Sequence, residues 1–134
     1  MSSRVATCSC GQLQVQVEGE PEVGICHCLA CQRRTGSAFA TLAAFSAPFH
    51  VEGVASEYVR ESGRGGERYR FRFCPTCGTN LFHTIQGDES FVLVAVGGFA
   101  DPGFPAPRDS VWTSRKHAWV ALPPDLSAHE RDPD

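Results

Sequence analysis

Seven cysteines carry most of the chemistry that this 134-residue sequence can perform. They fall into three groups, which read Cys8-Ser9-Cys10-Gly11, Cys26-His27-Cys28-Leu29-Ala30-Cys31 and Cys74-Pro75-Thr76-Cys77-Gly78. An odd number of cysteines cannot be fully paired as disulfides within one chain, and clustered cysteines in a reducing compartment more often bind metal ions. Because thiolate sulfur is a preferred ligand of zinc, the sequence predicts metal binding rather than a disulfide framework.

The spacing of the thiols suggests a site with four cysteines and a site with three. A tight turn between Cys74 and Cys77 can aim both sulfurs at one ion, and Cys8 and Cys10 would point the same way along extended backbone. Together these four thiols would complete a structural zinc site that closes a long loop of chain. The residues alone leave open a second division, in which the Cys74–Cys77 pair joins the middle group. A redox-active Cys74–Cys77 pair is less favoured, because a strand pattern follows it rather than a helix.

Cys26, Cys28 and Cys31 would then hold a second zinc ion with three protein ligands. Three protein ligands and one open position are typical of a catalytic zinc. Three thiolates leave such a centre with about one net negative charge, which favours thiol chemistry over hydrolysis, because a coordinated thiol is deprotonated. The alternative is a second structural site in which a histidine fills the fourth position. The candidates for that ligand are His27, His50, His83 and His117.

The hydrophobic pattern predicts a mainly β, antiparallel architecture with one short helical turn. Alternating or β-compatible stretches indicate strands at 12–18, 39–45, 49–54, 57–62, 68–73, 80–85 and 91–96, with breaks at 63–66 and 86–89. A helical turn is expected over Ala30–Thr35, ended by Gly36. Residues 1–122 are expected to form a single zinc-binding domain, and residues 123–134, which contain three prolines, a flexible tail.

Composition excludes several functional classes. The formal charge of −3 disfavours bulk electrostatic binding to nucleic acid or to an anionic membrane. The longest apolar run, 91–96, is far shorter than the ~18–20 residues of a membrane helix. The first seven residues carry no hydrophobic stretch, so we expect no secretion signal and a cytoplasmic location.

The cysteine motifs and the residues around them resemble the glutathione-dependent formaldehyde-activating enzymes, a family that includes the centromere protein V domain. The resembling segments are Cys8-x-Cys10-Gly11, Cys26-His27-Cys28-x-x-Cys31-Gln32-Arg33-x-Thr35-Gly36-Ser37-x-Phe39, Arg72-x-Cys74-x-x-Cys77-Gly78, Gly98–Pro102 and His117-Ala118-Trp119. The resemblance implies an Mss4-like fold and the same four-plus-three division of two zinc ions. It also implies a carbon–sulfur lyase that joins a glutathione-like thiol to formaldehyde or a related aldehyde, as an S-(hydroxymethyl)glutathione synthase does.

Several side chains beyond the cysteines are candidates for binding such a substrate. Those nearest the three-cysteine group are Gln32, Arg33, Arg34, Thr35 and Ser37, of which an arginine suits a carboxylate. The alternative for these residues is a solvated helix surface and its ending. Arg68, Arg70 and Arg72 are expected to form a solvated strand face. The aromatic residues expected to pack in the core are Tyr69, Phe71, Phe73, Phe82 and Phe91, with Trp112 and Trp119 as packing anchors. A zinc-stabilised binding module without catalysis is the alternative function.

Overall fold

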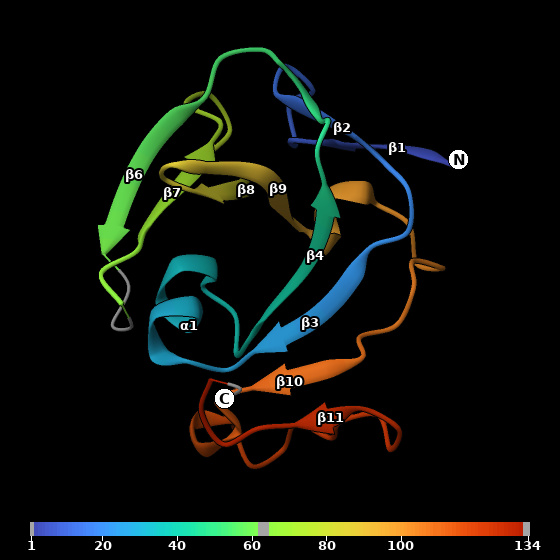
Figure 1. Ribbon diagram of the computed structural model, residues 1–134, viewed down its shortest axis with the longest axis vertical. Helices are drawn as coiled ribbons and strands as arrows, with labels where there is room; N and C mark the ends of the chain where they lie inside the picture. Colours follow the sequence, from blue (N-terminus) through green and yellow to red (C-terminus); the bar gives the residue numbers. More distant parts are fainter. Residues whose placement is uncertain (1, 62–64, 133–134) are drawn as a thin grey trace.

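Two β-sheets and one short α-helix make up the part of the chain that the computed structural model describes, residues 2–61 and 65–132 (Figure 1). The smaller sheet has the order β1 (Ser3–Thr7), β2 (Gln14–Glu18) and β5 (His50–Glu52). The larger sheet has the order β11 (Ser127–Ala128), β10 (Asp109–Val111), β3 (Glu22–Cys26), β4 (Ala40–Ser46), β9 (Asp88–Ala95), β8 (Asn80–Ile85), β7 (Arg68–Phe73) and β6 (Ser56–Glu61). The predicted mainly β fold is confirmed.

Most neighbouring strands run antiparallel, as predicted, but one edge of the larger sheet differs. Strand β10 pairs in parallel with both β3 and β11. Parallel neighbours need a long connection, and the long stretch of chain between β3 and β10 supplies one. Figure 1 shows the larger sheet curving around helix α1 (Leu29–Thr35), so that the helix faces the inner surface of the sheet.

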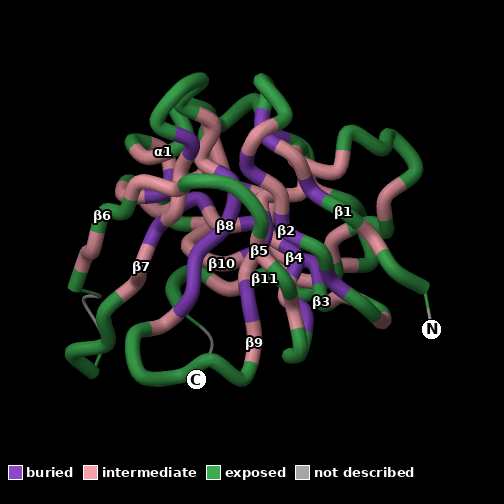
Figure 2. Tube along the Cα trace, turned by 90° about the horizontal axis from the view of Figure 1, so that it is seen from above, coloured by how far each residue is buried: buried purple, intermediate pink, exposed green. Residues whose placement is uncertain are grey.

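The hydrophobic core lies between the two sheets. In β2 the alternation predicted from the sequence is observed, because Val15 and Val17 are fully buried while their polar neighbours face outward. Across the core, β4, β8 and β9 contribute Phe45, Leu81, Val92 and Val94. Figure 2 shows these buried segments converging at the centre of the molecule, with exposed loops around them. Among the aromatic residues predicted as core, Phe71 and Phe82 are buried, whereas Tyr69, Phe73 and Phe91 are only partly buried, and Trp119 is exposed.

The ends of helix α1 are fixed by local chemistry. Cys28 caps its N-terminus, since the Cys28 sulfur accepts a hydrogen bond from the Cys31 N–H. Gly36 ends the helix in the left-handed conformation at φ 71°, which confirms the predicted C-cap. The helix starts at Leu29, one residue before the predicted Ala30.

Several predicted element boundaries differ from the structure. The predicted 86–89 break is a two-residue turn at Gln86 and Gly87, and β9 starts at Asp88, because Gly87 with φ 87° allows the chain to reverse within two residues. Ser62, Gly63 and Arg64 from the predicted strand end and break lie outside the described residues. The segment predicted as a tail contains β11, and residues 129–131 hydrogen-bond to the backbone after β10; its mobility stays a prediction. None of the helices in the described residues is long and apolar enough to cross a membrane.

Candidate metal centres and active site

Four sulfurs from both sheets converge at one end of the core. The Sγ atoms of Cys8, Cys10, Cys74 and Cys77 all lie within 4.8 Å of one another. Cys10 Sγ is 3.6 Å from Cys8 Sγ and 3.7 Å from Cys74 Sγ. Four sulfurs at about 2.3 Å from a tetrahedral zinc would be about 3.8 Å apart, so the spacing fits zinc, and it far exceeds the roughly 2 Å of a disulfide.

Two glycine-closed turns bring these four thiols together. After Cys74, the Gly78 N–H donates to the Cys74 carbonyl (2.8 Å), and Gly78 adopts a φ of 79°. After Cys8, the Gly11 N–H donates to the Cys8 carbonyl (3.0 Å), and Gly11 has a φ of 87°. The prediction of extended backbone at Cys8 and Cys10 is therefore wrong: a turn, closed by a glycine that tolerates positive φ, places both sulfurs on one side.

Hydrogen-bond donors contact several sulfurs of this cluster. Leu13 N–H donates to Cys8 Sγ (3.3 Å), and the Gln12 Nε2 amide donates to Cys74 Sγ (3.0 Å). Hydrogen bonds from Thr79 lower the pKa of Cys77 to about 5. The hydrogen bond from the Gln12 backbone lowers the pKa of Cys10, but burial and hydrogen bonds with the other three thiols outweigh it and raise this pKa to about 11. Metal ligation requires deprotonated sulfur, so a cation at this cluster must displace the Cys10 proton.

The second cluster lies where β3 passes into α1. Cys26 is the last residue of β3, Cys28 caps α1 and Cys31 lies in its first turn, and their three Sγ atoms are within 4.8 Å of one another. Hydrogen bonds from the Cys26 and Cys31 thiols hold the pKa of Cys28 far below its usual range, with help from the charge of Arg60. The predicted division of the thiols into groups of four and three is confirmed.

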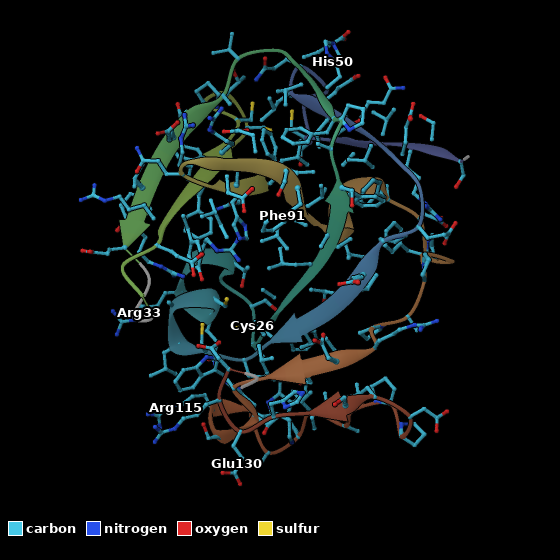
Figure 3. All side chains as sticks on the ribbon, in the orientation of Figure 1. Cys26, Arg33, His50, Phe91, Arg115 and Glu130 are labelled. Atoms are coloured by element: carbon cyan, nitrogen blue, oxygen red, sulfur yellow. The ribbon has the colours of Figure 1, made fainter. Side chains whose placement is uncertain are left out.

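The candidate histidines have other surroundings. His27 is fully buried and shares a 2.8 Å hydrogen bond with Ser110, so it points away from the sulfurs. His117 Nε2 lies 2.9 Å from Gln32 Oε1. Figure 3 shows His50 at one end of the molecule, well away from Cys26. In the described ranges 2–61 and 65–132, no histidine or carboxylate joins the three sulfurs within 4.8 Å.

A cavity of about 860 Å³ opens beside the three-cysteine cluster. One wall is the cluster with Arg34 of α1, and another consists of Arg60 of β6 and the aromatic residues Tyr69 and Phe71 of β7. Figure 3 shows Phe91 pointing into the curve of the sheet, where it lines the same cavity. The cavity therefore combines three thiols, an apolar floor and three guanidinium groups, those of Arg34, Arg60 and Arg131.

Two arginines and a histidine of this cavity pack against the ring of Phe71. The Arg34 and Arg60 guanidinium carbons lie 4.7 Å and 5.1 Å from the centre of the Phe71 ring, within cation–π range. His83 of β8 packs against the same ring at 4.7 Å. Burial, followed by the charges of Arg34 and Arg60, lowers the pKa of His83 to about 3, so His83 is neutral near pH 7.

Of the predicted substrate-binding residues, Arg34 lines the cavity. Its Nη2 atom is 4.0 Å from Cys31 Sγ. Gln32 instead ties the helix to two loops, donating from Nε2 to the carbonyl oxygens of His27 and Arg115. Thr35 Oγ1 donates to the Cys31 carbonyl and accepts from the Ser37 N–H, which ends the helix. Figure 3 shows Arg33 extending outward from the helix. Substrate binding by Gln32, Arg33, Thr35 and Ser37 stays a prediction.

The C-terminal segment supplies a further wall of the cavity, which the sequence did not indicate. Trp112 Nε1 donates a 3.0 Å hydrogen bond to Asp132 Oδ1, and Trp112 N–H donates to the Arg131 carbonyl. All three residues line the cavity, and Trp112 has a φ of 58°, which is rare for a bulky residue. Trp112 is therefore more than the packing anchor that was predicted.

Arg60, His83 and Arg131 are the cavity residues that sequence reasoning left out or did not place. The signals for Arg60 and His83 depend on strand pairing. Arg60 stands opposite Tyr69 in the β6–β7 register, and His83 stands opposite Phe71 in the β7–β8 register.

The predicted solvated face of β7 is instead partly covered, because Arg70 and Arg72 form ion pairs with Glu57 at 2.8 Å and 3.1 Å.

These features define a mainly β protein with two cysteine clusters that could hold metal ions, one of them beside a cavity. The glutathione-dependent formaldehyde-activating enzyme family matches residues 3–115, and the chain belongs to this family. The crystal structure of a Rhodobacter sphaeroides protein has a similar fold, with a TM-score of 0.53 and 24% identity over 75% of this chain and 90% of that one.

A curated relative shares only one part of its length with this chain. The homeobox-leucine zipper protein ROC8 of Oryza sativa subsp. japonica is 30% identical over 101 residues, which cover 72% of this chain. The match spans 14% of the rice protein.

Proposed function

We propose that this protein is a zinc-dependent carbon–sulfur lyase or synthase that joins glutathione, or a similar thiol, to formaldehyde or a related aldehyde. The observation that carries the proposal is the position of the three-cysteine cluster, whose sulfurs border a cavity of about 860 Å³. Membership of the formaldehyde-activating family supports the same reaction class. Because seven free thiols persist in a reducing compartment, a cytoplasmic setting is part of the proposal.

The two clusters have different proposed roles. Cys8, Cys10, Cys74 and Cys77 would hold a structural zinc, since four sulfurs complete a tetrahedral site. Cys26, Cys28 and Cys31 would hold a second zinc, which lowers the pKa of an incoming thiol. The three-cysteine donor set fits this role, because its three sulfurs lie close enough to share one ion and all three residues line the cavity.

The proposed reaction adds the S–H bond of the thiol across the C=O bond of the aldehyde. A sulfur–carbon bond forms, the carbonyl π electrons move to oxygen, and that oxygen takes up the proton that the thiol releases. The chain's own residues would hold the two reactants together, with the apolar side chains of Phe71, Phe91 and Leu93 limiting water and Arg34 lying near the sulfur cluster.

The experiment measures how fast glutathione and formaldehyde exchange with their S-hydroxymethyl adduct, by two-dimensional NMR exchange spectroscopy. Full-length protein loaded with two zinc ions per chain should exceed the spontaneous exchange rate at least about tenfold. Removal of metal with a chelator should return the rate to the spontaneous value, and added zinc should restore it. A zinc-loaded protein that accelerates exchange with none of several thiols and aldehydes would contradict the proposal and favour a non-catalytic binding module.

A further inference from the structure

Two arginines of the cavity share one aromatic ring. Arg34 reaches the Phe71 ring from helix α1, and Arg60 reaches it from strand β6. Two like charges held beside one apolar side chain repel each other, and this repulsion is stronger in a partly enclosed cavity than in bulk water. Such an arrangement is stabilised when an anion binds between or beside the two groups.

Compensation for these two charges comes from the sulfur cluster rather than from carboxylates of the described residues. Neither Arg34 nor Arg60 forms an ion pair within residues 2–61 and 65–132, where the ion pairs involve Arg70, Arg72 and His50. Glu61 and Asp132 also border the cavity, but they form no ion pair with either arginine in the described segments.

One polar atom at this point is buried without a partner. The Arg34 Nε–H is shielded from solvent and has no hydrogen-bond partner among the described residues. An unsatisfied buried donor on a charged group costs free energy, and a ligand oxygen would remove that cost. Arg34 also stands next to the sulfur cluster, with Nη2 at 4.0 Å from Cys31 Sγ. A ligand thiol at the cluster would therefore place its own anionic group within reach of the guanidinium groups.

From these contacts we propose that Arg34 and Arg60 form a carboxylate-binding element that selects thiols carrying a carboxylate over neutral thiols. The inference rests on the proposed function, because it assigns the substrate class to the same cavity. Guanidinium groups match carboxylates in geometry and form charge-assisted hydrogen bonds with them. The ring of Phe71 keeps both groups oriented toward the cavity before the ligand arrives.

A different role for the two arginines makes a different prediction. If Arg34 and Arg60 served only to retain the metal at the sulfur cluster, their loss would weaken the binding of charged and neutral ligands alike. The test therefore compares two ligands with the same tripeptide skeleton, one with free carboxylates and one with esterified carboxylates. S-methylglutathione carries free carboxylates and cannot react through sulfur, and its diethyl ester carries the same skeleton with the carboxylates masked.

The experiment measures the affinity of both compounds by isothermal titration calorimetry for the zinc-loaded, full-length protein. Wild-type protein should bind the free acid at least about tenfold more tightly than the ester. Arg34→Gln and Arg60→Gln should each weaken binding of the acid by about tenfold to a hundredfold, the effect of losing a charge-assisted hydrogen bond, and should change ester binding less than about twofold. Arg108→Gln removes an exposed charge outside the cavity and should change neither affinity.

Each outcome decides the inference. Equal losses for acid and ester, no preference in the wild-type protein, or no binding of either compound would overturn it. Because binding is measured without reaction, the inference and the proposed function fail separately. Accelerated adduct exchange without a carboxylate preference would retain the function and reject the arginine pair, whereas a preference without acceleration would do the reverse.

Discussion

Cys10 Sγ lies 3.7 Å from Cys74 Sγ, although 64 positions separate the two residues in the sequence. Cys10 belongs to the turn that joins β1 to β2 in the smaller sheet, and Cys74 directly follows β7 in the larger sheet. A metal ion at this cluster would therefore link the two sheets that enclose the core. Closing so long a loop stabilises the folded state, because the free energy of metal binding adds to that of folding.

We predict that Cys77→Ser destabilises the protein far more than Cys31→Ser. Cys77→Ser removes a ligand from the cluster that links both sheets and should lower the thermal unfolding midpoint by more than about 10 °C, since structural zinc contributes roughly 10–16 kcal/mol of apparent binding energy in small peptides. Cys31→Ser alters a cluster formed by one strand end and one helix, and should spare most of the fold while losing the second metal.

Scanning calorimetry and zinc analysis by mass spectrometry together check this pair of variants. Cys31→Ser protein should retain about one zinc per chain and unfold within about 5 °C of the wild type. Similar thermal destabilisation by both substitutions would show that the two clusters do not have separate structural and functional roles.

A second prediction concerns Gly53, which follows β5 next to Gln12. A Cβ atom at Gly53 would collide with the Gln12 carbonyl oxygen, and Gly53 has a φ of 95°. The Gln12 side chain accepts a hydrogen bond from the Val54 N–H and donates to the Val54 carbonyl and to Cys74 Sγ. Gln12 therefore connects the chain after β5 to the four-cysteine cluster. Gly53→Ala therefore combines backbone strain with a displaced cluster, and should lower the free energy of unfolding by more than about 3 kcal/mol.

Gly19→Ala is the matched control for this substitution. Gly19 has a φ of 87°, but nothing lies within 4 Å of an added Cβ. It should cost only the strain of a left-handed alanine, about 1–2 kcal/mol. Urea unfolding of both zinc-loaded variants measures the difference, and equal costs would refute the steric contact at Gln12.

The bounds of β7 and β8 agree with the prediction at both ends. For β7 the reason is strict alternation, because the charged and aromatic residues of Arg68–Phe73 leave one register for a half-buried strand. Strand β3 was missed because Gly24 interrupts its pattern. The structure explains this glycine: an added Cβ would collide with the Asp109 side chain of the neighbouring strand β10. Such a contact between distant segments leaves no local signal.

The candidate site also has a part that local sequence signals predict and a part that depends on contacts between distant segments. The cysteines could be grouped from spacing, since ligand geometry is a local property of each motif. The turn at Cys8 and Cys10 was misread as extended, because both conformations place residues two apart on one side. The positions of Arg60 and the buried His83 in the cavity depend on which strands pair and in which register. Only the folded sheet brings these two residues to the sulfur cluster.

The last prediction concerns the pH dependence of stability through His83. Its side chain is 5% exposed, packs on Tyr69 and Phe71, and faces the charges of Arg34 and Arg60. Burial, followed by those charges, lowers the pKa of His83 to about 3, whereas histidine in an unfolded chain titrates near 6.5. The unfolded state therefore binds more protons than the folded state between these values. Stability from His83 is fully present above pH 6.5 and is lost as the pH falls toward 3.

Between pH 7 and pH 5, the neutral His83 should account for a loss of about 2 kcal/mol in the free energy of unfolding. Urea unfolding of zinc-loaded protein at both pH values measures the wild-type loss, to which the cysteine clusters also contribute. His83→Gln should reduce this loss by about 2 kcal/mol, because glutamine does not titrate and the clusters are unchanged. His50→Gln, which alters a side chain 67% exposed, should retain the wild-type difference between the two pH values. If His83→Gln and wild-type protein lose the same free energy, His83 is protonated in the folded state, and the argument from burial and the two arginines is wrong.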